Sequence, residues 1–199
     1  MDDVVRLEPL AATHAAALRE AAAGPREAYA FASVPTPGSV DAFVAESLAR
    51  AAAGTHWPLV QVDARDGRVV GCTAYLSPRR WPDGRLLAIE IGSTWLNADA
   101  QGTAINTAAK RLLLTHAFDV LGVVRVDLKT DARNARSRAG IEAIGARLEG
   151  VLRSWQPSAA PGEAGLARDT AMHSITVAEW PAVRARLDGR LAAKRAGLR

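Results

Sequence analysis

Cysteine is nearly absent from this chain of 199 residues, which has only Cys72. A single cysteine cannot form an internal disulfide, which excludes a small disulfide-stapled scaffold, and this length can bury a sizeable core without staples. No run approaches the roughly 20 apolar residues that a membrane-spanning helix needs. The start, Met1-Asp2-Asp3, is acidic where a secretory signal would be basic. We therefore expect a cytoplasmic protein with no membrane partner.

The chain also lacks the residue spacing of metal sites and of nucleic-acid stacking platforms. Its four histidines are scattered, so we expect no metal, and its five tryptophans follow no period. The 25 Lys and Arg residues exceed the 21 Asp and Glu residues by four, a modest excess that suits an anionic ligand or simple solubility. A basic nucleic-acid-binding protein is an alternative that rests on this charge balance alone, and we do not expect a nucleic acid partner.

Hydrophobic periodicity and turn residues predict strands that alternate with helices. Strands are expected at 4–7, 59–62, 69–76, 86–96, 123–128, 147–155 and 171–176. Helices are expected at 14–23, 39–54, 105–121 and 134–144 and from 180 onward, with Thr13 and Ser39 as N-caps of the first two and a basic loop at 77–84. The order predicts an α/β fold with a mixed sheet and helices on both faces. We expect one domain over 1–199, in which 181–199 form a basic C-terminal helix or tail.

The most informative stretch is 87–106, which reads as a strand, a short polar turn and a long helix. The first backbone N–H groups of a helix are unpaired and carry partial positive charge. Because Gly102, Thr103 and Ala104 are small, a phosphate could approach those donors closely. Taken alone, the same pattern fits an ordinary strand-to-helix turn.

Two blocks in this stretch, Glu90-Ile91-Gly92-Ser93-Thr94-Trp95-Leu96 and Gln101-Gly102-Thr103-Ala104-Ile105-Asn106, resemble the acetyl-CoA site of GCN5-related N-acetyltransferases (GNAT). The resemblance is greatest to the branch of the ribosomal-protein N-terminal acetyltransferases RimJ and RimL. That family's pyrophosphate loop reads Gln/Arg-x-x-Gly-x-Gly/Ala, and Gln101 matches its first position. Ala104 replaces the usual Gly, and Asn106 replaces Gly or Ala. The methyl group of Ala104 is expected to tighten or shift the phosphate cradle.

Two later blocks agree with this family. Residues 127–146 resemble its strand, Asn-x-x-Ser motif and short helix, and residues 149–153 with 168–175 resemble the closing hairpin of the branch. The resemblance covers most of 4–180 in the family's order. It implies a mixed sheet that is splayed by a bulge and holds acetyl-CoA in the splay.

The resemblance also implies a reaction and a role for each matching residue. An acetyl group would pass from acetyl-CoA to an amine. Backbone N–H groups of 101–106, that is Gln101, Gly102, Thr103, Ala104, Ile105 and Asn106, would hold the pyrophosphate. The strand edge at Thr94, Trp95 and Leu96 would pair with the pantetheine amides. Asn134 matches the residue that hydrogen-bonds the cofactor arm, and Ser137 the one that protonates the leaving thiolate.

A transferred amine must lose a proton, so a general base is needed. Glu90, at the centre of its strand, is the best carboxylate by position, and we expect it to act through water. The alternatives are that Glu90 faces solvent or pairs with an arginine, that Asn134 is only a helix N-cap, and that the Ser137 hydroxyl is only a local backbone partner.

The sequence does not identify the amine that would accept the acetyl group. It could be a protein N-terminus or a small-molecule amine, held by the first two helices and the loop 156–168. A homodimer is compatible with the branch. A CoA-binding regulatory module that has lost catalysis is the alternative function, suggested by Ala104 and Asn106.

Overall fold

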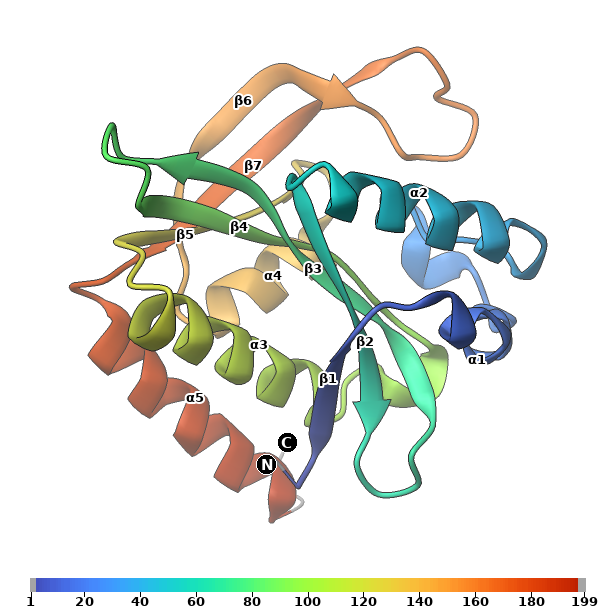
Figure 1. Ribbon diagram of the computed structural model, residues 1–199, viewed down its shortest axis with the longest axis horizontal. Helices are drawn as coiled ribbons and strands as arrows, with labels where there is room; N and C mark the ends of the chain where they lie inside the picture. Colours follow the sequence, from blue (N-terminus) through green and yellow to red (C-terminus); the bar gives the residue numbers. More distant parts are fainter. Residues whose placement is uncertain (1–2, 197–199) are drawn as a thin grey trace.

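The computed structural model describes residues 3–196, and one seven-stranded mixed sheet runs through them in the order β1-β2-β3-β4-β5-β7-β6 (Figure 1). Its strands are β1 (Val5–Pro9), β2 (His56–Asp63), β3 (Val69–Arg80), β4 (Leu86–Leu96), β5 (Arg125–Asp131), β6 (Arg147–Pro157) and β7 (Ala167–Thr176). The neighbours β4 and β5 run parallel, and they pair over three rungs that end at Glu90 and Asp127. Beyond those residues the two strands separate, which opens the sheet along its middle.

Helices cover both faces of this sheet. α1 (Ala15–Ala21) and α2 (Val40–Ala52) pack on β2 and β3 through a core that includes Leu18, Val44 and Val60. α3 (Ile105–Thr115) and α5 (Trp180–Arg195) lie side by side on the other face. The end of α4 (Ala135–Ala143) joins the core under α5. The predicted fold class, a mixed sheet with helices on both faces, is confirmed.

The amphipathic stretch after the polar turn forms α3 and then a π-helical turn, His116–Val120, that ends before Gly122. Gly122 has a φ of +65°, which side-chain-bearing residues rarely adopt, so glycine stops the helix there. The predicted boundary near residue 121 follows from this glycine.

Two predicted N-caps are wrong in their chemistry. Thr13 lies inside a 3₁₀ turn, Ala12–His14, and α1 begins after His14 without a side-chain cap. Ser39 does stand at the N-cap of α2, but its hydroxyl bonds to Thr36 in the preceding turn and not to the helix. In both places a 3₁₀ turn leads into the helix and supplies the geometry that a capping side chain would provide.

The predicted basic loop at 77–84 is also wrong, because β3 continues through Arg80. Ser77 has a φ of +50° and the register with β4 shifts between Leu76 and Arg79. The strand thus absorbs the Ser-Pro pair in an irregular stretch, and the turn lies between Trp81 and Arg85, where the two backbones bond to each other.

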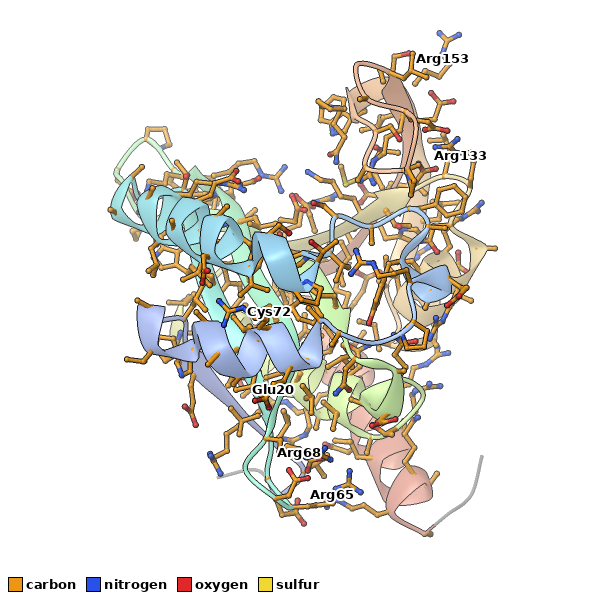
Figure 2. The ribbon with its side chains drawn as sticks, turned by 90° about the vertical axis from the view of Figure 1, so that its right-hand side faces the viewer. Glu20, Arg65, Arg68, Cys72, Arg133 and Arg153 are labelled. Atoms are coloured by element: carbon orange, nitrogen blue, oxygen red, sulfur yellow. The ribbon has the colours of Figure 1, made fainter. Side chains whose placement is uncertain are left out.

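Within 3–196, no helix has the length and apolar composition needed to cross a bilayer. Cys72 is buried on β3 in the core beneath α1 and α2 (Figure 2). Burial raises the pKa of its thiol to about 12, so it is a packing residue. Of the predicted basic C-terminal segment, the structure shows α5, and 197–199 lie outside the described residues.

Candidate active site

A cavity of about 690 Å³ lies where β4 and β5 separate. Its walls come from β4, the turn before α3, the facing sides of α3 and α4, the end of β5 and the loop 28–33. A larger hollow of about 1090 Å³ lies against β1 and α3, but its walls are mainly apolar and none of the predicted site residues lines it. The chemistry therefore belongs in the smaller cavity.

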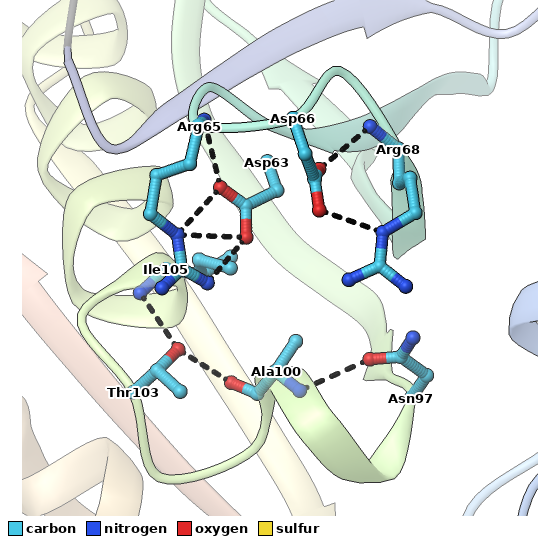
Figure 3. A network of polar contacts seen from close by, with 8 residues as sticks. All are labelled: Asp63, Arg65, Asp66, Arg68, Asn97, Ala100, Thr103 and Ile105. Carbon is cyan, nitrogen blue, oxygen red and sulfur yellow. Dashed lines mark hydrogen bonds and ion pairs between the residues drawn. The ribbon is translucent and has the colours of Figure 1, made fainter.

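The turn that enters α3 is held by its own polar side chains (Figure 3). The Asn97 side chain accepts a hydrogen bond from the Ala100 amide at 3.0 Å. The Thr103 hydroxyl donates to the Ala100 carbonyl at 2.7 Å and accepts from the Ile105 amide at 3.3 Å. Lys194, from the end of α5, donates to the carbonyls of Gly102 and Thr103. These bonds fix the turn without using its first amides.

Those amides are hydrogen-bond donors that the turn leaves unused. The backbone N–H groups of Gly102, Thr103 and Ala104 have no hydrogen-bond partner among the described residues. They stand at the N-terminus of an 11-residue helix, where unpaired donors and the helix dipole both favour an anion. This end of the cavity can hold a phosphate.

The side chain of Gln101 ties the turn to its surroundings. Its Nε2 donates to the Leu96 carbonyl at 2.8 Å and to the Tyr29 hydroxyl at 3.2 Å, while its Oε1 accepts from Arg136 at 2.7 Å. Tyr29 also donates to the Leu96 carbonyl. Gln101 thus positions the turn, and the amides that follow it are left to contact a ligand.

Ala104 does not narrow the cavity. Its side chain packs against the cluster that contains Val5, Ile105 and Leu191, on the side away from the cavity. Gln101, Gly102 and Asn106 line the cavity, whereas Thr103, Ala104 and Ile105 do not. The expected tightening or shift of the phosphate cradle by the extra methyl group stays a prediction.

Glu90 lies at the last rung that joins β4 to β5, and only 5% of its surface is exposed. Its neighbours Ile89 and Ile91 enter the core under α3 and α5, so the alternation of a strand turns Glu90 to the opposite face. There its Oε2 lies 2.8 Å from the Nζ of Lys129 on β5. The carboxylate therefore neither faces solvent nor pairs with an arginine; it pairs with a lysine.

Lys110 is a buried amine in the cavity wall. Its Nζ donates to the Thr94 hydroxyl at 2.7 Å, and burial lowers the pKa of this amine to about 7. Thr94 in turn shares a hydrogen bond with Thr73 at 2.9 Å. Asn106 lies one turn before Lys110 on α3, and its side-chain oxygen is buried without a partner among the described residues. The Lys110 amine and the Asn106 side-chain oxygen are thus two polar groups of the cavity wall that a ligand could contact.

The start of α4 supplies the last wall. The Asn134 side-chain oxygen accepts from the Ser137 amide at 2.9 Å, so Asn134 is the N-cap of α4. Both residues line the cavity. The cap uses the backbone of Ser137, and its hydroxyl is left for a ligand.

The comparisons with known proteins decide the family. The model of the acetyltransferase (GNAT) domain matches residues 5–147. This chain belongs to the GNAT family. No curated protein matches its sequence at a significant level.

Three solved structures illustrate the GNAT likeness. A T. thermophilus protein described as an acetyltransferase is 34% identical, with a TM-score of 0.79 over 96% of this chain and 95% of that one. A GCN5-related N-acetyltransferase from Brucella melitensis is 28% identical, with a TM-score of 0.80 over 96% and 84%. RimJ of Mycobacterium smegmatis, in complex with CoA-disulfide, is 25% identical, with a TM-score of 0.74 over 94% and 88%. The predicted resemblance to the family is confirmed.

The GNAT fold brings most of the sequence-predicted residues around one cavity. Those that line it are Glu90, Thr94, Trp95, Leu96, Gln101, Gly102, Asn106, Asn134 and Ser137. Their individual roles stay predictions. In 3–196 no group of three or more acidic, histidine or cysteine side chains is arranged to hold a metal ion.

Polar residues of the GNAT cavity that were not predicted as site residues include Tyr29, Lys110, Lys129 and Arg168. Lys129 lies on the face of β5 that Glu90 occupies on β4, because Asp127 pairs with Glu90 and Lys129 follows Asp127 by two residues; that register comes from the structure and not from the sequence. Lys110 lies four residues after Asn106, on the same side of α3. Arg168 and Tyr29 reach the cavity through contacts between distant segments, which no local pattern announces.

Proposed function

We propose that this GNAT protein transfers the acetyl group of acetyl-CoA to a primary amine. The observation that carries the proposal is one cavity lined both by Gly102, at the start of a turn with unpaired helix amides, and by the buried Glu90 carboxylate, all among the described residues. The first suits a pyrophosphate, and the second suits the removal of a proton from an amine.

The edge of β4 supports a cofactor arm between these ends. Past Glu90 the pairing with β5 has ended, so no strand lies beside the backbone at 94–96 on that side, although the Leu96 carbonyl already accepts hydrogen bonds from Gln101 and Tyr29. An extended pantetheine could bond to this backbone as an added strand does. The RimJ structure with CoA-disulfide shows that a relative of this fold holds the CoA skeleton.

In the proposed reaction the neutral amine attacks the thioester carbonyl carbon. The new C–N bond forms, the C–S bond breaks, and the amine proton passes to Glu90 through water. The Ser137 hydroxyl gives a proton to the departing thiolate and is reprotonated by solvent. Lys129 holds the carboxylate in place through its 2.8 Å ion pair. Each proton that leaves one group thus has a named acceptor.

The thermal shift with acetyl-CoA tests the proposal first. A ligand present at a hundredfold excess over its Kd adds about 2.7 kcal/mol of stability, which corresponds to a rise of about 5–10 °C at this chain length. Thiol release with an amine panel then tests transfer. A thermal shift without transfer to any amine would favour a regulatory module that binds CoA, and no shift at millimolar acetyl-CoA would refute the cofactor site.

The finer parts of the proposal follow the RimJ/RimL resemblance. They are a protein N-terminus or a small amine as acceptor, a homodimer, and a cytoplasmic location. Each stays a prediction for this chain.

A further inference from the structure

The cavity wall holds a half-buried guanidinium that forms no ion pair with the described residues. Arg168, near the start of β7, lines the cavity, and its Nε is buried without a hydrogen bond. One terminal nitrogen reaches the Phe31 carbonyl at 3.5 Å, a long contact. Burial lowers the pKa of this guanidinium, yet an arginine keeps its charge at neutral pH. Removing part of a charged group from water without a partner is costly.

The two carboxylates whose charges act on Arg168 are already paired with other cations. Asp131 accepts two hydrogen bonds from the Arg133 side chain, at 3.0 Å and 2.7 Å. Glu90 is paired with Lys129. Asp131 and Glu90 interact with Arg168 through space, but neither forms an ion pair with it within the described part of the chain. The positive charge of Arg168 is therefore available to bind an anionic group of a ligand.

Basic side chains outnumber acidic ones in the wall of the cavity. Among the described side chains that line it, Glu90 is the single carboxylate, against five basic ones: Arg50, Lys110, Lys129, Arg136 and Arg168. Arg136 is bonded to Gln101 at the phosphate end, and Lys110 to Thr94 on β4. Of the other three, Lys129 is paired with Glu90 and Arg168 interacts with Glu90 through space. A polycationic acceptor would be repelled from this region, whereas an acceptor with its own negative charge would be attracted.

We infer that the acceptor is an amine that also carries a carboxylate, such as a free amino acid, and that Arg168 binds this carboxylate. The inference rests on the proposed function and narrows its substrate class. The planar guanidinium can donate two parallel hydrogen bonds to a carboxylate, which fixes the acceptor's orientation as well as its charge. With the carboxylate at Arg168, the amine is presented toward Glu90 on the neighbouring part of the wall.

The test compares α-amino acids with their own primary amides as acceptors, with CoA thiol release as the readout. We expect kcat/KM to be about tenfold or more higher for the acid than for its amide, the size of one hydrogen-bonded charge contact. The amine of an amino acid amide has a lower pKa than the amine of the amino acid, so a larger fraction of it is neutral. Intrinsic reactivity alone would therefore favour the amide, which is the opposite of the expected preference. Spermidine is expected to be a poor acceptor.

Arg168→Gln should abolish the preference by raising KM for the acid while leaving the amide nearly unchanged, and Arg168→Lys should keep part of it. Arg153→Gln is the matched control, because Arg153 is an exposed residue within β6 that does not line the cavity (Figure 2). Melting temperatures of all variants with and without acetyl-CoA show that each is folded and binds it.

Equal use of acid and amide, or a preference that survives in Arg168→Gln, would overturn the inference while leaving acetyl transfer intact. If no amine is acetylated, calorimetry with an N-acetylated amino acid and its amide, in the presence of CoA, decides the matter. Tighter binding of the acid that depends on Arg168 supports the carboxylate site, and equal binding refutes it. Failure of acetyl-CoA itself to bind is a separate result that refutes the proposed function.

Discussion

Lys129 and Glu90 face each other across the point where β4 and β5 part, with 2.8 Å between Nζ and Oε2. A base that is buried and held by one lysine has a fixed position, which suits proton transfer through an ordered water. Replacing Glu90 with Gln keeps its shape and removes its charge. We expect kcat to fall by about a hundredfold or more, while the thermal shift with acetyl-CoA persists.

Asp127→Asn is the matched control for Glu90→Gln. Asp127 is the partner of Glu90 in the β4–β5 register and is bound by Arg125 at 2.6 Å, but it does not line the cavity. Turnover of Glu90→Gln that equals wild type across the pH range would remove Glu90 from the mechanism.

The same pair makes a prediction for stability. Lys129→Met leaves a buried carboxylate without its cation, which should lower the free energy of unfolding by about 2–3 kcal/mol. The double variant Lys129→Met/Glu90→Gln removes both charges and should regain most of that loss. Urea unfolding of the four proteins measures the cycle. Additive losses from Lys129→Met and Glu90→Gln would contradict the coupling of this pair. As a control, Arg79→Met breaks the exposed ion pair with Asp127 and should lower the free energy of unfolding by about 1 kcal/mol or less.

Gly92 controls where the Glu90 carboxylate can lie. A Cβ at this position would come within 2.9 Å of Glu90 Oε1 and 2.8 Å of Leu76 Cδ1. Gly92→Ala should therefore displace the carboxylate without removing it and lower kcat by about tenfold, since misplacement of a reacting group is costly. Gly189→Ala on α5, where a Cβ meets nothing within 4 Å, is the control and should keep full activity. An unaltered kcat in Gly92→Ala would mean that the position of Glu90 is not critical.

Ser137→Ala isolates the hydroxyl of Ser137 from the N-cap of α4. Because the cap uses the Ser137 amide, the variant should fold normally, bind acetyl-CoA with nearly unchanged affinity and turn over about tenfold or more slowly. Single-turnover kinetics with calorimetry separates the two quantities. A matching loss in affinity would make Ser137 a cofactor ligand. Asn134→Ala, by contrast, should destabilise the protein by about 1 kcal/mol through the lost cap.

Lys110 makes stability depend on pH. Burial lowers the pKa of its amine from 10.5 to about 7, so between these values the unfolded chain holds a proton that the folded chain has released. The contribution of Lys110 to the free energy of unfolding therefore rises with pH above 7, by up to about 1.4 kcal/mol per pH unit. Urea unfolding between pH 6.5 and 9 should show this slope in the wild type and its loss in Lys110→Met. Parallel curves for the two proteins would show that Lys110 titrates normally.

Local patterns predicted the order of the elements and most of their bounds. The alternation around Ile89 and Ile91 placed β4 at 86–96, as observed, and the three- and four-residue spacing before Gly122 placed α3 and its π-helical turn. These features depend on neighbours in the sequence. The local signal misled at Thr13, where a 3₁₀ turn replaces the start of the helix, and at Ser77, where β3 continues through the predicted loop.

The partners of the site residues could not be predicted in the same way. Whether Glu90 meets Lys129 depends on the register of two strands that are separated in the chain by residues 97–124, and a slip of one residue would turn either side chain away. Arg168 reaches the cavity because the β6–β7 hairpin and the loop that holds Phe31 converge. Such meetings are tertiary contacts, which residue spacing does not encode.

The pairing between β4 and β5 is short, and a bound ligand could extend it. Three rungs join the two strands, and a bound pantetheine arm would lie along the unjoined length. The cosubstrate would then hold two half-sheets together, and amide hydrogens of β5 should exchange more slowly with CoA bound. Departure of the product would undo this extension. Backbone hydrogen bonds along the unpaired part of β4 would thus tighten acetyl-CoA binding and slow CoA release at the same time.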